Sequence, residues 1–231
     1  MLSSLPFGSF LSYSPHGMSQ EERRSIAVGR RIKQDGFMRQ ADGDVVRIIR
    51  YTVARLRAGI TPELADLLAA DVVLVPTPGS APLPPGQPHA LWAARRICEE
   101  LLAAGFGART EPLLWRENAV PKSAFAAREN RSRPDLHQHY ESLAACPPVP
   151  GEAAPARITL VDDFITKGAT LLAAASRLAE ACGGAEIRAF ALVRTQYPIG
   201  HQRRKQIFRA IVDPIHSRVT LGRHGAWRRD P

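Results

Sequence analysis

Two apolar runs separated by one helical pattern constrain the fold of this chain more than any other feature. Arg157–Val161 and Glu186–Val193 are short and apolar, as strands are when a sheet is covered on both faces. Between them, Thr170–Cys182 has apolar residues at helical spacing and is followed by Gly183 and Gly184, which are typical helix stops. Strand, helix and strand in this order predict an α/β fold with a mainly parallel sheet flanked by helices.

The first 70 residues are predicted to be helical. Capping residues and apolar spacing predict three helices there: Ser19–Lys33, which begins with a capping box, Asp44–Leu56, and Thr61–Ala70, which begins with an N-cap threonine and an N1 proline. The apolar run Asp71–Pro76 that follows is the first predicted strand.

The middle of the chain alternates loops with regular elements. A Gly- and Pro-rich loop, Thr77–Pro88, follows the first strand, and His89–Ala104 has helical spacing. Arg109–Trp115 is a candidate second strand, whereas Asn118–Tyr140 is polar and basic, and Pro147–Pro155 is typical of a flexible connection. The predicted organisation is therefore a helical N-terminal segment (1–70), an α/β core (71–194) and a basic C-terminal segment (195–231).

The loop after the strand Arg157–Val161 has the residues of a phosphate site. Asp162 and Asp163 emerge at the carboxyl edge of the predicted sheet, where open α/β sheets bind ligands. Thr166–Thr170 then supplies hydroxyl groups and one glycine, Gly168, before a helix N-terminus whose free N–H groups attract phosphate. Carboxylates repel a phosphate of the same charge, so their presence beside this site indicates a different role. They could accept hydrogen bonds from ribose hydroxyls or hold Mg²⁺ through water. The segment therefore predicts a site for a phosphorylated ribose.

The segment Val161-Asp-Asp-Phe-Ile-Thr-Lys-Gly-Ala-Thr170 resembles the motif with which type I phosphoribosyltransferases bind 5-phosphoribosyl 1-pyrophosphate (PRPP). The resemblance implies an open, twisted, mainly parallel sheet flanked by helices, with a small helical N-terminal segment or hood. It also implies that Asp162 and Asp163 are catalytic and contact the ribose hydroxyls and Mg²⁺. The residues that would bind the 5′-phosphate are Ile165, Thr166, Lys167, Gly168, Ala169 and Thr170.

Two positions in this loop depart from the family pattern. Position 167 is usually Thr or Ser, and Lys167 either adds a positive charge beside the phosphate or points outward. Family members that act on 6-oxopurines have an aspartate base where this chain has Thr166, which disfavours hypoxanthine and guanine as acceptors.

The resemblance also implies two groups of pyrophosphate-binding residues. One is the small-residue loop after the first strand, although an ordinary strand–helix turn has the same composition: Thr77, Pro78, Gly79 and Ser80. The other lies where family members have a basic loop that closes over pyrophosphate, and solvated surface charges are its alternative interpretation: Lys122, Arg128 and Arg131. Three features resemble the ComF-like branch most closely: the segment Tyr13…Gly17…Ile32-Lys33-Gln-Asp35, the turn Val75-Pro76-x-Pro78 and the basic loop. Many members of that branch carry an N-terminal Cys-rich zinc module, which is not seen in this sequence.

The implied reaction is transfer of the 5-phosphoribosyl group of PRPP to a nitrogenous base, with Mg²⁺-assisted release of pyrophosphate. The acceptor base is not identified by the sequence, and the family resemblance implies a homodimer. The alternative function is non-catalytic: a ComF-like protein that senses PRPP or a nucleotide, or that binds nucleic acid. A scaffold with a vestigial site is a third interpretation.

Charge and composition bear on partners and location. The net charge is +9, and residues 194–231 alone carry nine Lys or Arg against two Asp, which suits either polyanion binding or a solvated tail. Three separated cysteines argue against a disulfide framework, and His137 with His139 has strand-type metal spacing but no third ligand nearby. Without a membrane-spanning apolar run or a recognisable signal peptide, a cytoplasmic location is expected.

Overall fold

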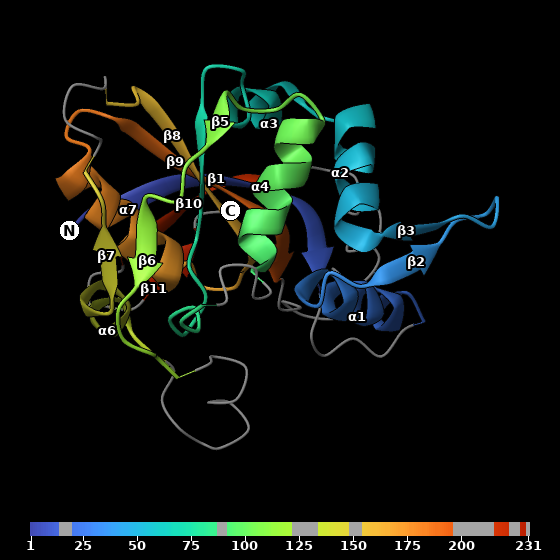
Figure 1. Ribbon diagram of the computed structural model, residues 1–231, viewed down its shortest axis with the longest axis horizontal. Coiled ribbons are helices and arrows are strands. Elements are labelled where there is room, and N and C mark those ends of the chain that lie inside the picture. Colours follow the sequence, from blue (N-terminus) through green and yellow to red (C-terminus); the bar gives the residue numbers. More distant parts are fainter. Residues whose placement is uncertain are drawn as a thin grey trace.

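The computed structural model describes residues 1–13, 20–86, 92–121, 134–147, 154–195, 215–221 and 227–229. Within these ranges the chain forms a seven-stranded sheet of order β11-β10-β1-β9-β8-β4-β5 (Figure 1). Its five neighbouring parallel strands are β1 (Ser4–Tyr13), β9 (Glu186–Thr195), β8 (Arg157–Ile165), β4 (Val73–Pro76) and β5 (Arg109–Thr110). β10 (Ile215–Leu221) and β11 (Trp227–Arg229) extend the β1 edge in antiparallel order. The predicted α/β class is confirmed.

Helices cover both faces of the parallel strands. Along β9, Ala189 and Ala191 belong to one hydrophobic core, whereas Phe190 and Leu192 belong to the other, because successive side chains point to opposite faces. The first core includes α7 (Ala169–Ala181). The second core packs against four helices: α1 (Gln20–Lys33), α2 (Ile48–Ala58), α3 (Pro62–Leu67) and α4 (Ala93–Ala103).

Smaller elements surround this framework. The hairpin of β2 (Phe37–Arg39) and β3 (Val45–Arg47) projects from the molecule beside α1 (Figure 1). A second pair, β6 (Leu114–Arg116) and β7 (Leu143–Ala145), flanks α6 (Leu136–Glu141) in the sequence, and α6 packs against α7. No helix in the described part of the chain has the length and apolarity required to cross a membrane.

The prediction that residues 1–70 are helical is wrong for Ser4–Tyr13, which is a strand between β9 and β10. Pro6 and Gly8 are depleted in strands, so this run lacks a strand signal. Packing explains Gly8, because a Cβ at this position would lie 2.5 Å from Cδ2 of Leu64 on α3. The expected boundary at residue 70 does not divide the structure, since segments on both sides of it share one sheet.

Other predicted elements have different bounds. The helix expected from Asp44 begins at Ile48, because Val45–Arg47 pairs with β2 as a strand. The single strand expected over Arg109–Trp115 is two strands in separate sheets, β5 and β6. Helix α4 begins at Ala93, and β8 continues to Ile165 rather than ending at Val161. The C-terminal segment supplies β10 and β11 to the main sheet.

Candidate functional site

A cavity of about 530 Å³ opens at the carboxyl ends of β4 and β8. Segments far apart in the sequence line it: the loop after β4, the end of β8 with the first residues of α7, and α6 with the residues before it. The lining residues are Lys33, Pro78, Gly79, Ser80, Arg116, Pro121, Pro134, Asp135, His139 and the continuous run Asp162–Leu171.

The loop predicted to bind the 5′-phosphate lies against this cavity. Gly168 is the N-cap of α7 and has φ +84°, in the left-handed region that favours glycine. The carbonyl of Gly168 accepts the first helical hydrogen bond, from the N–H of Leu172 at 2.9 Å. The preceding Thr166 shares a hydrogen bond of 3.1 Å with the hydroxyl of Thr195 on β9, and Lys167 is exposed. The positive end of α7 therefore faces the cavity through a loop with small residues.

The acid pair lies within β8 rather than after it. On one side Asp162 is in register with Ala191 of β9, whereas on the other side β4 has ended at Pro76, opposite Val161. Asp162 and Asp163 are thus beyond the last residue of β4, at the carboxyl edge of the sheet. Both of them line the cavity together with the α7 loop.

The acid pair has an unusual electrostatic environment. Burial raises the pKa of Asp162 well above its usual value, and the neighbouring Asp163 carboxylate raises it further. Two influences favour the charged form: the N–H of Asp163 donates to Asp162 Oδ1 at 2.8 Å, and the Lys33 ammonium lies nearby. A cation or hydroxyl donors in the cavity would relieve the repulsion between the two carboxylates.

The loop after β4 closes another side of the cavity. Pro78, Gly79 and Ser80 line it, whereas Thr77 does not; its N–H donates to the carbonyl of Val161 at 2.8 Å. The carbonyl of Thr77 accepts a hydrogen bond from Nε1 of Trp92 at 2.7 Å. This indole therefore anchors the start of the loop and does not itself line the cavity.

Among the cavity residues that were not predicted for this site, two are polar and buried. Arg116 on β6 is 4% exposed and donates from Nε to the carbonyl of Gly79 at 2.9 Å. His139 on α6 is 5% exposed, and its Nε2 lies 3.4 Å from Oγ1 of Thr170. Burial lowers the pKa of Arg116 to about 10. Burial is also the main cause that lowers the pKa of His139 to about 4, and the positive charge of Arg116 lowers it further. The sequence signal for both was weak, because neither belongs to the loop motif.

The histidine pair and the predicted basic loop have different outcomes. His137 is exposed and pairs with Glu141, whereas His139 is buried and lines the cavity. Both lie on helix α6, so they do not have the strand spacing at which two such histidines could share a metal ion. The predicted cationic residues Lys122, Arg128 and Arg131 lie outside the described residues. In the part of the chain that the structure describes, no group of three or more His, Cys, Asp or Glu side chains is placed to hold a metal ion.

No protein-family model and no curated protein matches this chain. The functional assignment therefore depends on the chemistry and geometry of the cavity.

Proposed function

We propose that this protein is a PRPP-dependent phosphoribosyltransferase of the type I family, of the ComF-like branch. One observation carries the proposal: the acid pair, the loop that begins α7 and the loop after β4 all line a single cavity. These segments are the ones whose sequences resemble the ribose, 5′-phosphate and pyrophosphate sites of that family. A shared cavity supports a ligand with phosphate groups at two ends and a ribose between them.

The residues fit Mg²⁺ together with PRPP. Mg²⁺ in such sites takes one or two carboxylates from the protein and completes its shell with substrate phosphates and water. Asp162 and Asp163 are the carboxylates that would serve, directly or through water, and they would accept hydrogen bonds from ribose hydroxyls. Mg²⁺ would neutralise charge on the departing pyrophosphate when it is bound.

Different cavity residues would contact different parts of PRPP during the reaction. The bond from C1 of the ribose to the pyrophosphate oxygen breaks, and its electron pair leaves with pyrophosphate. The acceptor nitrogen supplies the electron pair of the new bond to C1 and loses its proton to solvent. The ribose passes through a state with oxocarbenium character, as in glycoside chemistry. Backbone N–H groups of the loop after β4 would stabilise the charge on pyrophosphate, while the start of α7 would hold the 5′-phosphate.

The carbon–nitrogen transfer is tested with PRPP, Mg²⁺ and a panel of free bases. We expect pyrophosphate release with at least one base, and a rise in the thermal midpoint when PRPP and Mg²⁺ are added to the wild-type protein. Asp163→Asn removes one carboxylate from the pair and should abolish the thermal shift. Asp44→Asn, on the exposed β2–β3 hairpin, is the matched control and should keep the shift. Equal shifts in wild type and Asp163→Asn would contradict the assignment.

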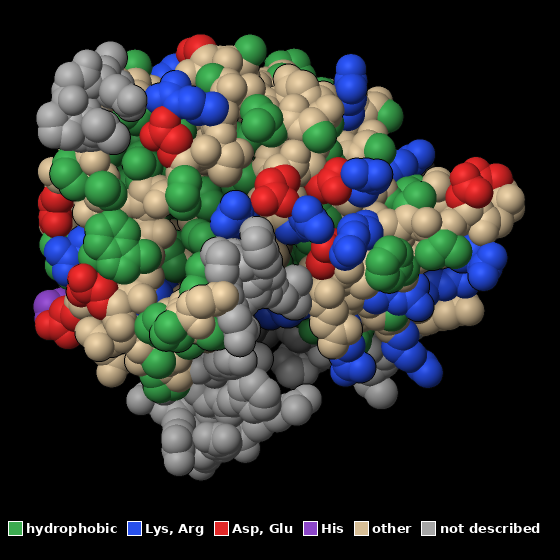
Figure 2. Space-filling view, viewed as in Figure 1, with side chains coloured by type: hydrophobic (Ala, Val, Ile, Leu, Met, Phe, Trp, Pro, Cys, Tyr) green, Lys and Arg blue, Asp and Glu red, His purple; other side chains and the backbone are tan. Residues whose placement is uncertain are grey.

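Nucleic-acid binding is a second candidate function, and the charge of the surface supports it. Figure 2 shows Lys and Arg side chains gathered over α1 and the β2–β3 hairpin, and the net charge of the chain is +9. Such a surface favours a protein that binds nucleic acid. Binding of nucleic acid that is independent of the acid pair would distinguish this function from the transferase.

A further inference from the structure

Arg116 connects two parts of the cavity wall that are distant in sequence. Its Nε donates to the carbonyl of Gly79 in the loop after β4, at 2.9 Å. Its Nη1 donates to Oγ of Ser142 and to the carbonyl of His139, the latter at 3.4 Å. A guanidinium has donors in a fixed planar fork, so one arginine holds both groups at a set separation. The loop after β4 is thereby tied to α6.

His139 extends this connection to the phosphate loop. Its Nε2 lies 3.4 Å from Oγ1 of Thr170, the second residue of α7. The His139 carbonyl accepts a second hydrogen bond, from Oγ of Ser142 at 2.9 Å, which fixes the backbone that carries the imidazole. The capping box between Asp135 and Gln138 orders the first turn of α6. The chain of contacts therefore runs from Gly79 through Arg116 and α6 to Thr170.

The imidazole also prepares the Thr170 hydroxyl for a phosphate. Nδ1 of His139 is buried and has no hydrogen-bond partner among the described residues. We assign the proton of the neutral ring to Nε2, because the other tautomer would bury an N–H donor without an acceptor. His139 then donates to Oγ1 of Thr170, and the proton of that hydroxyl remains available to a phosphate oxygen.

We propose that Arg116 and His139 form a brace that sets the distance between the 5′-phosphate loop and the loop after β4. Both are positioning residues, and the inference rests on the proposed function, in which PRPP spans these two loops. A ligand that engages two subsites gains affinity from both only when their separation matches its own. Loss of the brace should therefore weaken the binding of PRPP far more than the binding of a ligand that occupies one subsite.

The test compares three probes by calorimetry on the full chain: PRPP with Mg²⁺, ribose 5-phosphate, and pyrophosphate with Mg²⁺. Arg116→Lys keeps the positive charge but loses the planar set of guanidinium N–H donors that contacts both Gly79 and α6. His139→Leu removes the contact with Thr170. We expect each variant to bind PRPP about tenfold to a hundredfold more weakly, with the affinities for the two smaller probes nearly unchanged. Ser142→Ala removes one acceptor of Arg116 and should give a smaller loss for PRPP in the same direction.

Arg177→Lys is the matched control. Arg177 lies on α7 and donates to the carbonyl of Tyr140, so it also joins α6 to α7, but it lies outside the cavity wall. This variant should bind all three probes as the wild type does.

Each other outcome overturns the brace. A parallel loss for PRPP and pyrophosphate in Arg116→Lys would make Arg116 a direct ligand. An equal loss of affinity for all three probes would indicate general damage to the fold. Unchanged PRPP affinity in both variants would show that Arg116 and His139 do not set the distance between the two loops. Wild-type protein that binds ribose 5-phosphate or pyrophosphate but not PRPP would contradict the proposed function itself, and the brace with it.

Discussion

Gly168 is the residue on which the proposed phosphate-binding loop most depends. Its φ of +84° lies in the left-handed region, where a residue with a Cβ is strained by about 1–2 kcal/mol. We expect Gly168→Ala to lower the free energy of unfolding by that amount and to weaken ribose 5-phosphate binding by about tenfold, because the start of α7 shifts. Chemical denaturation and calorimetry measure the two effects.

Gly184 offers a matched control just beyond the other end of α7. Its φ is +90°, and a Cβ there would meet no atom within 4 Å. Gly184→Ala should therefore give a similar loss of stability with ribose 5-phosphate affinity unchanged. If both variants lost affinity equally, the loop at Gly168 would have no special part in binding.

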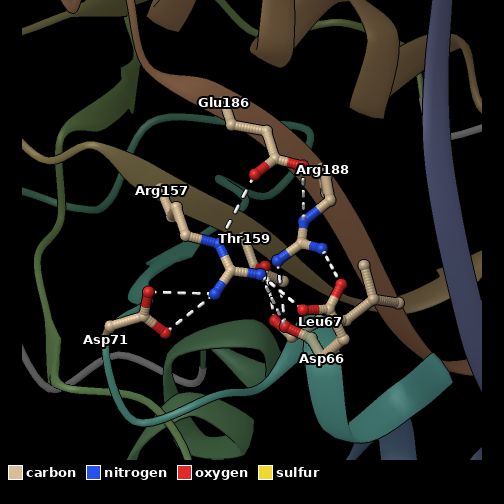
Figure 3. Close-up of polar contacts among 7 residues, drawn as sticks. All are labelled: Asp66, Leu67, Asp71, Arg157, Thr159, Glu186 and Arg188. Carbon is tan, nitrogen blue, oxygen red and sulfur yellow. Dashed lines mark hydrogen bonds and ion pairs between the residues drawn. The ribbon is translucent and has the colours of Figure 1, made fainter. Parts of the chain in front are cut away.

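At the scale of elements, an ionic network joins α3 to the amino ends of β8 and β9 (Figure 3). Arg157 on β8 donates to Oδ1 of Asp66 at 2.6 Å and to both carboxylate oxygens of Asp71 at 2.9 Å. Arg188 on β9, 7% exposed, also bonds Asp66. Oγ1 of Thr159 donates to the carbonyl of Leu67 at 2.6 Å, which holds the end of α3 against the sheet. The network lies at the sheet edge opposite the cavity.

This network predicts how stability depends on pH. Hydrogen bonds from Arg157 and then Arg188 hold the pKa of Asp66 below its ordinary 3.8. The stabilisation is therefore complete above that value and is lost as the pH falls through the lower pKa of the folded state. Asp66→Asn should cost about 1 kcal/mol at pH 7, since the carboxylate is largely exposed and screened by solvent. The difference from wild type should disappear in acid.

Thermal midpoints of wild type and Asp66→Asn between neutral pH and about pH 2 check this expectation. PRPP binding should stay the same in the variant, because its change lies at the amino edge of the strands. A constant difference at every pH would show that the ionised carboxylate is not what stabilises α3.

At the scale of the whole molecule, the net charge of +9 should produce weak, non-specific binding to nucleic acid. Such binding depends on counterion release and falls steeply with salt, so we expect it to be lost between about 50 and 200 mM salt. Fluorescence anisotropy with labelled duplex and single-stranded DNA measures this, with Asp163→Asn as a comparison. Binding that persists at 200 mM in wild type and Asp163→Asn would favour the nucleic-acid function over the transferase.

The local elements were predictable because their signals lie close together in the chain. The helix ending at Lys33, the strand Arg157–Val161 and the helix after Gly168 each follow from apolar spacing, capping or stop residues within a few positions. The strand Ser4–Tyr13 was missed because Pro6 and Gly8 weaken its strand signal, and Gly8 is explained only by neighbours on another element, such as Leu64 of α3.

The candidate site divides in the same way. Asp162, Asp163 and the loop to Thr170 form one continuous segment, so a ligand-binding role could be proposed for them from residue types and order alone. Arg116 and His139 enter the same cavity only because β6 and α6 pack beside α7 and the loop after β4. No short-range pattern encodes such contacts, because they depend on how distant segments pack together. Sequence order thus accounts for the loop proposed to bind the ligand, and tertiary packing accounts for the buried charge and imidazole that surround it.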